Sequence, residues 1–285
     1  MKFSRGVQYI LISGVCFSIV HASVKALSHI DIYEVVFFRA LISLIISYYF
    51  LYKKKIPIFG AHKFGLFLRG ITGSIALGLY FYTLQKMPLA TAVTLQYLSP
   101  VFVIFFAYLF LNEKFNPWQI PFIALSFMGV VIVKNFDPNT SFELTLIALA
   151  GALFSGLAYT FIRKLSGKVD PHLTVFYFPF VTLPIAIPLM WANWTTPNFY
   201  ESLQLLNMGV LTYVAQIFLT KAYYAEQPSK VDPYKYIAVI YSVIIGYVFF
   251  DEVISVQSFF GIVIIILGVY GSDYFARKPI KQTTI

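Results

Sequence analysis

One stretch of this sequence, built from two apolar runs joined by a short polar turn, occurs twice and constrains the fold more than any other feature. The first copy covers residues 95–130 and the second covers residues 234–269. A shift of 139 positions aligns the copies without a gap and places Gly129 on Gly268. We therefore expect the two halves of the chain to fold into related units.

The composition places these two units in a membrane. Hydrophobic residues make up 59% of the 285 residues and charged residues only 12%, whereas soluble domains carry about 25% charged residues. Because about 20 apolar residues cross a bilayer as a helix, the apolar runs predict an all-α integral membrane protein with ten transmembrane helices. Their expected ranges are 7–26, 33–52, 64–85, 89–111, 117–134, 143–163, 174–193, 205–224, 230–250 and 255–274.

The basic residues of the short loops indicate how the helices are oriented. Lys and Arg fall mainly on the side that carries both termini, for example at residues 53–55 and at Arg163, and basic loops stay in the cytoplasm. We therefore expect a multi-pass protein of the bacterial cytoplasmic (inner) membrane with both termini cytoplasmic. Because five crossings per half turn the second half upside down, residues 1–137 and 138–285 are predicted to be inverted five-helix repeats.

Inverted repeats are typical of secondary transporters, which hold their substrate near the membrane midplane between the halves. A simple duplication without a transport role is the alternative. The net charge of +9 is explained by the loop topology, so we expect no nucleic-acid partner. The chain has a single cysteine, Cys16, and contains no Walker loop, two-histidine zinc pattern or nucleophile elbow. The sequence therefore predicts no cofactor, no metal site and no enzyme activity.

The repeated stretch also resembles a known family. The motif YLSPVFVIFFAYLFLNE at residues 97–113, its counterpart PYKYIAVIYSVIIGYVFFDE at residues 233–252, and the glycine that follows each are similar to the drug/metabolite transporter superfamily, EamA type. Phe37, Phe38 and Arg39 resemble the subset that contains organic-anion and rickettsial S-adenosylmethionine carriers. The resemblance implies ten helices in two inverted halves, a central cavity lined by helices 1, 3, 4, 6, 8 and 9, and alternating access by two rocking bundles.

Two basic residues inside apolar helices are the first candidates for substrate contact, because a charge in the hydrocarbon costs about 3 kcal/mol and is retained for a reason. Arg39 lies about six residues inside the second helix, with a structural ion pair as the alternative role. Lys235 lies at the depth at which its repeat partner Gln96 lies in the fourth helix. Asp232 is close enough in sequence to neutralise Lys235.

Other polar residues of the helices complete the candidate substrate site. Tyr97 and Tyr236 follow the pair just described and could offer hydroxyls and ring faces, although packing at the membrane interface is an equal alternative. Gln216 is an amide at mid-span, whereas His21 is more simply explained as a packing histidine. Lys25 is included because it lies on the side that carries few basic residues. The candidate site is therefore Arg39, Lys235, Gln96, Tyr97, Tyr236, Gln216, Lys25 and His21.

Several other residues are expected to be structural. Arg69 lies near enough to a helix end to extend its charge into the headgroup region. Glu113 and Glu252, at the turns of the two copies, are expected to cap the helices that follow them or to hold the turn. Pro100 could form a hinge or a static kink. Three prolines should kink or interrupt the seventh helix; they are Pro179, Pro184 and Pro188.

The sequence thus favours a secondary transporter, an exporter or an exchanger, of a small polar metabolite that is anionic or zwitterionic. Its expected partners are this small-molecule substrate and the lipid bilayer, with the protein a monomer or homodimer. Proton-driven export of cations is disfavoured because the first helix carries no embedded acid. A lipid or lipid-linked sugar flippase, or a broad-specificity drug exporter, remains the alternative, and a membrane enzyme lacks a visible acid or histidine cluster.

Overall fold

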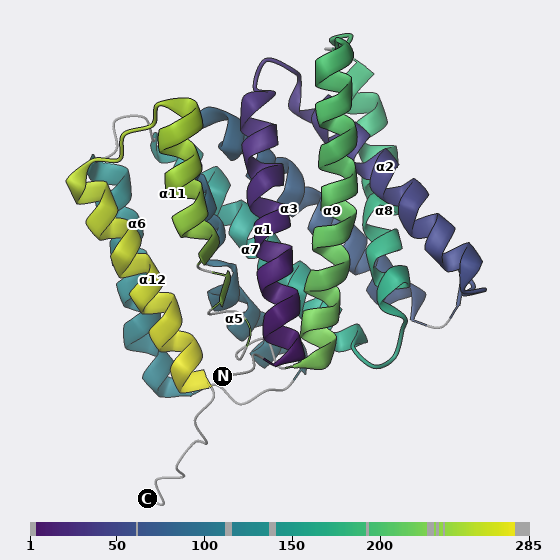
Figure 1. Ribbon diagram of the computed structural model, residues 1–285. Coiled ribbons are helices and arrows are strands. Elements are labelled where there is room, and N and C mark those ends of the chain that lie inside the picture. Colours follow the sequence, from purple (N-terminus) through teal and green to yellow (C-terminus); the bar gives the residue numbers. More distant parts are fainter. Residues whose placement is uncertain are drawn as a thin grey trace, which may run out of the picture.

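The computed structural model describes residues 4–60, 62–111, 116–136, 141–191, 194–226, 231, 234–235 and 237–276. Within these ranges every regular element is a helix (Figure 1). The first half contains α1 (Arg5–Ala26), α2 (Ile32–Lys53), α3 (Lys63–Lys86), α4 (Leu89–Gln96), α5 (Ser99–Leu111), η1 (Pro117–Gln119) and α6 (Ile120–Phe136). The second half contains α7 (Phe142–Leu165), α8 (Pro171–Met190), α9 (Phe199–Ala225), α11 (Ile237–Phe250) and α12 (Val256–Ala276).

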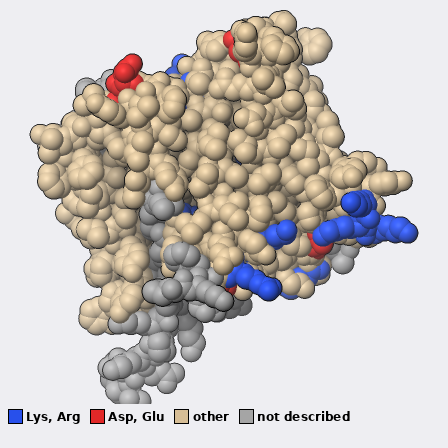
Figure 2. Space-filling model, viewed as in Figure 1, with Lys and Arg blue, Asp and Glu red and all other residues tan. Residues whose placement is uncertain are grey.

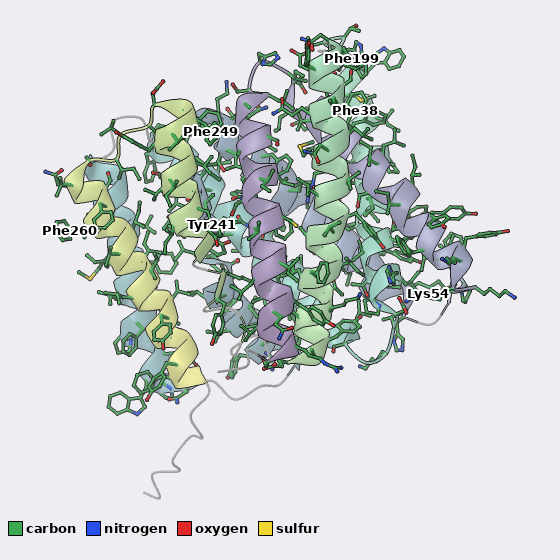
Figure 3. The ribbon with its side chains drawn as sticks, viewed as in Figure 1. Phe38, Lys54, Phe199, Tyr241, Phe249 and Phe260 are labelled. Carbon is green, nitrogen blue, oxygen red and sulfur yellow. The ribbon has the colours of Figure 1, made fainter. Side chains whose placement is uncertain are left out.

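These helices confirm the ten predicted crossings. Seven spans are long and apolar enough to cross a membrane, and α4 and α5 together form one of them. Three shorter apolar helices, over residues 117–132, 238–250 and 256–272, supply the others. Figure 2 shows the charged side chains of the visible face mainly at its edges, with a broad band of uncharged residues between them. Phe249 and Phe260, 74% and 59% exposed, project outward from α11 and α12 in this band (Figure 3).

Corresponding helices of the two halves run in opposite directions. The amine of Lys25, in the last turn of α1, bonds to the carbonyl of Met87 just after α3 ends. In the loop that follows α1, His29 bonds to Glu201 in the first turn of α9. The end of α3 and the start of its counterpart α9 therefore lie at the same end of the bundle, which is the upper end in Figure 1. The start of α1 and the end of α12 lie at the lower end.

Two of the crossing helices differ from their predicted form. The fourth, expected to be continuous over residues 89–111, breaks at Tyr97 and Leu98 into α4 and α5. Pro100 explains the break, because it has no N–H to donate to the carbonyl of Gln96. The ninth has a 3-10 turn at Tyr234 and Lys235, just before α11. In the repeat these two residues correspond to Leu95 and Gln96, the last two residues of α4.

The seventh predicted helix also differs, in the opposite sense. α8 continues without interruption through all three of its prolines. It packs against α2 and α3, and in membrane proteins neighbouring helices and Ser or Thr hydroxyls can compensate for the hydrogen bonds that a proline removes. The hydroxyl of Thr182 lies 2.7 Å from that of Ser74 on α3, which is one contact of this packing. The prolines therefore do not interrupt the helix, and the alternative of a kink stays a prediction.

The two repeat glycines lie where α6 of the first half packs against α12 of the second half. α6 and α12 pack along each other at one edge of the bundle (Figure 1). A Cβ atom on Gly129 would lie 2.8 Å from the carbonyl oxygen of Gly261, and one on Gly268 would lie 2.7 Å from that of Phe122. Only glycine allows the two backbones to approach this closely, which explains why both copies carry it at this position.

We expect Gly129→Ala to destabilise the protein, because the added methyl group must push α12 away from α6. Overpacking of this kind costs about 1–3 kcal/mol. Thermal unfolding in detergent micelles measures the effect. Gly78→Ala is the matched control, since a Cβ there meets nothing within 4 Å and alanine favours the helix. Equal melting temperatures for the two variants would contradict the close contact.

Candidate functional site

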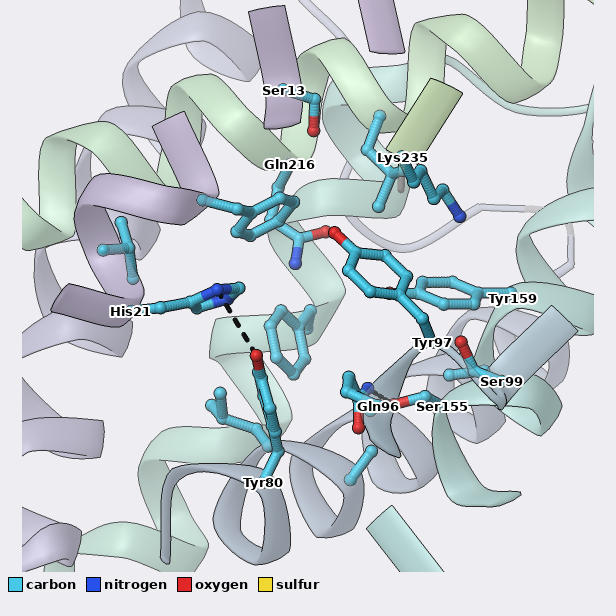
Figure 4. Close-up of a pocket in the computed structure, with 18 of the residues that line it drawn as sticks. Ser13, His21, Tyr80, Gln96, Tyr97, Ser99, Ser155, Tyr159, Gln216 and Lys235 are labelled. Carbon is cyan, nitrogen blue, oxygen red and sulfur yellow. Dashed lines mark hydrogen bonds between the residues drawn. The ribbon is translucent and has the colours of Figure 1, made fainter. Parts of the chain in front are cut away.

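A cavity between the helices is lined by residues of both helix breaks, Tyr97 and Lys235. Both halves line it: α1 to α5 contribute from the first, and α7 to α9 and Lys235 from the second. Figure 4 shows its polar side chains converging from these elements. Its ionisable and amide side chains are His21, Arg39, Arg69, Tyr80, Gln96, Tyr97, Tyr159, Gln216 and Lys235. No aspartate or glutamate is found among the described residues that line it.

Arg39 enters the cavity from α2 and is 3% exposed. Its Nε donates to the hydroxyl of Thr212 on α9 at 2.9 Å. Its guanidinium carbon lies 4.9 Å from the ring centre of Phe81 and 5.5 Å from that of Phe178. The alternative role as an ion-pair member finds no support in the described part of the chain, where no acid lies within 4.0 Å of its nitrogens.

Arg69 also lines the cavity, and its expected snorkelling is wrong. The side chain is 3% exposed, its Nη2 donates to the amide oxygen of Gln216 at 3.4 Å, and its guanidinium lies 4.6 Å from the ring centre of Phe178. The sequence holds one signal for this placement. Gly73 follows four positions later on the same helical face, and a Cβ there would collide with the guanidinium, so glycine leaves the space that Arg69 occupies.

Lys235 lies on the other side of the cavity, as its repeat position predicts. Its amine bonds to the hydroxyl of Tyr223 and lies 4.8 Å and 4.7 Å from the ring centres of Tyr159 and Tyr223. These rings stabilise a desolvated cation through their negative faces. Asp232, the expected neutralising partner, lies outside the described residues. The tyrosines around Lys235 gave no sequence signal, because tyrosine is one of the commonest residues of this chain.

Gln96, the repeat partner of Lys235, lies at the end of α4. Its Nε2 donates to the hydroxyl of Ser155 on α7 at 2.6 Å, and its Oε1 is buried without a hydrogen-bond partner among the described residues. Tyr97 follows it in the helix break and extends toward Gln216 across the cavity in Figure 4. Gln96 and Tyr97 of the first half thus reach Ser155 and Gln216 of the second half. Tyr236 lies outside the described residues.

His21 lines the cavity from α1. Its Nδ1 lies 3.3 Å from the hydroxyl of Tyr80, as the dashed line in Figure 4 marks. Its ring stacks on that of Phe17, with the ring centres 5.9 Å apart. His21 therefore has both a polar and an aromatic neighbour, as a packing histidine requires, and it also reaches the cavity surface.

Lys25 is the one candidate among the described residues that the structure does not bring to this cavity. Its amine lies 2.7 Å from Oε1 of Glu252 and 2.8 Å from the carbonyl of Met87. Oε2 of Glu252 accepts the backbone N–H of Leu89 at 2.8 Å. Glu252 therefore caps the start of α4, and the prediction that it caps the helix after it is wrong. Glu113 lies outside the described residues.

We call Lys25, Met87, Leu89 and Glu252 the upper junction. It joins the ends of α1 and α3 to the start of α4 and to the residues that follow α11, at the end of the bundle opposite the start of α1. Its charged side chains are only 15% and 14% exposed.

Among the described residues, no group of three or more His, Cys, Asp or Glu side chains could hold a metal ion.

Comparison with known proteins links this arrangement to transport. The profile of the EamA-like transporter family matches the chain twice, over residues 4–134 and 144–272. The pseudopaline exporter CntI of Pseudomonas aeruginosa is 32% identical over 268 residues, which cover 92% of this chain and 94% of that protein. The S-adenosylmethionine uptake transporter of Rickettsia prowazekii is 28% identical, with 98% and 96% covered.

Similarity also extends to an animal protein and to a solved structure. Solute carrier family 35 member G1 of Mus musculus is 29% identical over 266 residues, which cover 87% of this chain and 72% of that protein. One crystal structure superposes with a TM-score of 0.66 over 94% of this chain and 97% of its own, at 15% identity. At that identity the superposition supports the fold alone.

The upper junction generates a prediction about stability. We expect Lys25→Gln and Glu252→Gln to be coupled in a double-mutant cycle by about 1–3 kcal/mol, because each charge is mostly buried and satisfied by the other. Reversible unfolding in mixed micelles measures the free energy. The control cycle is Lys54→Gln with Asp170→Asn, a pair 3.4 Å apart whose side chains are 46% and 29% exposed. We expect its coupling to stay below about 0.5 kcal/mol; equal coupling in the two cycles would mean that burial does not strengthen the pair at the upper junction.

Proposed function

Because the chain belongs to the EamA-like transporter family, with both halves matching its profile, we propose that it exports or exchanges a small anionic or zwitterionic metabolite by alternating access. The transport of a small metabolite is common to the exporter and the uptake carrier that it resembles. The charge of the solute and the direction are our own proposals. The proposed setting is the bacterial cytoplasmic membrane, with both termini in the cytoplasm and the protein a monomer or homodimer.

One observation supports a negative charge on the solute. Arg39 and Arg69 are each 3% exposed, and the described lining of the cavity offers them no carboxylate. Burying a cation without a counter-charge costs several kcal/mol. An anionic solute, or the carboxylate end of a zwitterion, would supply the missing charge when it binds. Lys235, 8% exposed, adds a third basic group to the same cavity.

The position of the cavity supports alternating access. It lies between inverted halves and beside two interrupted helices, the arrangement in which secondary transporters bind substrate near the midplane. The cavity is lined by residues from both halves, including Gln96 and Lys235 at equivalent positions of the repeat. Motion of one half against the other would therefore change the exposure of the same binding residues from one side of the membrane to the other.

We expect the double variant Arg39→Gln, Lys235→Gln to lose anion transport. Loss of one hydrogen bond to a charged group costs about 1.5–3 kcal/mol, so counterflow in proteoliposomes should slow about 10-fold or more. The solute panel consists of amino acids, organic acids and nucleotide derivatives. Lys54→Gln, which changes an exposed lysine outside the cavity, is the control and should transport at the wild-type rate.

Three outcomes would count against the proposal. Unchanged transport of every anionic solute by the double variant would refute the role of charge. A wild-type protein that moves no member of the panel would favour the alternative of a lipid or lipid-linked sugar flippase, which fluorescent lipid analogues in the same vesicles would then test. Transport of hydrophobic cations with no anion movement would favour a broad-specificity drug exporter.

A further inference from the structure

Within the cavity, two guanidinium groups share one aromatic ring. Arg39 on α2 and Arg69 on α3 come from neighbouring helices of the first half, and both lie against Phe178 on α8. Two like charges repel each other, and the repulsion is strong where water is excluded. Both arginines are 3% exposed, so a specific reason must keep them together.

The protein fixes both arginines from one face of α9. Thr212 accepts from Arg39, and Gln216, one helical turn later, accepts from Arg69. These acceptors are neutral and leave donors unused. Nη1 of Arg39 and Nε of Arg69 are buried and have no hydrogen-bond partner among the described residues. Buried polar groups are nearly always paired, and an unpaired donor on a buried charge is especially costly.

We infer that Arg39 and Arg69 together form a subsite for an oxyanion group, a carboxylate or a phosphate, of the transported solute. An oxyanion matches the unused donors in charge, and its several oxygens can accept from both arginines at once. Phe178 contacts both guanidinium groups, whose central carbons lie 5.5 Å and 4.6 Å from its ring centre. The inference rests on the proposed function and adds where the anionic end of the solute binds.

Lys235 is not part of this subsite. Its amine bonds to Tyr223 and lies over the rings of Tyr159 and Tyr223, whereas the arginines lie against Phe81 and Phe178. The subsite therefore has its own elements, α2, α3, α8 and α9. It is a site for one end of the solute, and the rest of the solute extends into the remainder of the cavity.

Binding to the purified full-length protein tests the subsite without transport. The probes are succinate and inorganic phosphate, with sodium chloride at equal ionic strength as the reference. We expect one of the two oxyanions to raise the melting temperature saturably above the chloride reference, since a ligand that binds only the folded state stabilises it. A larger response to succinate indicates a carboxylate site, and a larger response to phosphate indicates a phosphate site.

Variants then assign the response to the two arginines. In Arg39→Gln and in Arg69→Gln we expect the half-saturating concentration to rise about 10-fold or more, the equivalent of one hydrogen bond to a charged group. Arg69→Lys keeps the charge but loses the fork, and Gly73→Ala keeps both arginines but displaces Arg69; both should weaken binding in the same way. Arg5→Gln, at an exposed position, should bind as the wild type does.

A purely structural role for Arg69 makes a different prediction. If the guanidinium only stabilised the fold, Arg69→Gln would melt below the wild type without added anion. We expect it to melt at the same temperature or higher, because the variant removes an uncompensated buried charge. A lower melting temperature together with an unchanged oxyanion response in Arg69→Lys and Gly73→Ala overturns the inference. So does a wild-type protein that responds to oxyanions only as it responds to chloride.

The subsite and the proposed function can fail separately. If the wild type shows counterflow of an anionic solute but neither arginine variant changes the oxyanion response, the subsite is refuted and the transport proposal is not. Oxyanion binding that requires both arginines, without counterflow of any solute in the panel, supports the subsite and refutes the transport proposal.

Discussion

Backbone groups inside a bilayer must find hydrogen-bond partners within the protein, because the hydrocarbon offers none. This constraint makes every described element a helix and makes a helix break expensive wherever lipid could reach it. Each break contributes one residue to the polar cavity, Tyr97 from the fourth crossing and Lys235 from the ninth. An interrupted backbone is tolerated there because it lies within the protein and beside a polar cavity.

The same constraint explains why the cavity is rich in paired polar groups. Ser13 on α1 donates to the carbonyl of Ala215 on α9 at 2.9 Å, and Gln96 donates to Ser155 across the two halves. Three cavity residues keep a buried atom without a hydrogen-bond partner among the described residues: Arg39, Arg69 and Gln96. The two arginines differ from Gln96 because their unused donors belong to cations, which supports the proposal that they bind a ligand.

Much of the fold followed from the sequence, because apolar runs and a repeat that aligns without a gap can be read directly from it. The ten crossings and the pairing of Gln96 with Lys235 at equivalent depth needed nothing else. Arg69 was misjudged because distance from a helix end says nothing about which neighbour covers a side chain. The interruption expected in α8 does not occur, and this helix packs against α2 and α3. Contacts between distant helices decided both cases.

Glu252 shows how one such contact can shape the motion of the protein. A carboxylate that only capped its own following helix would stay with that helix during any rearrangement. At the upper junction it instead bonds the start of α4 and the end of α1 at the same time. Separation of these helices must break the ion pair, and without it Lys25 and Glu252 are left as charges that need water. The structure holds this end of the bundle in the joined form, and under the proposed alternating access a separated form would have to hydrate both charges.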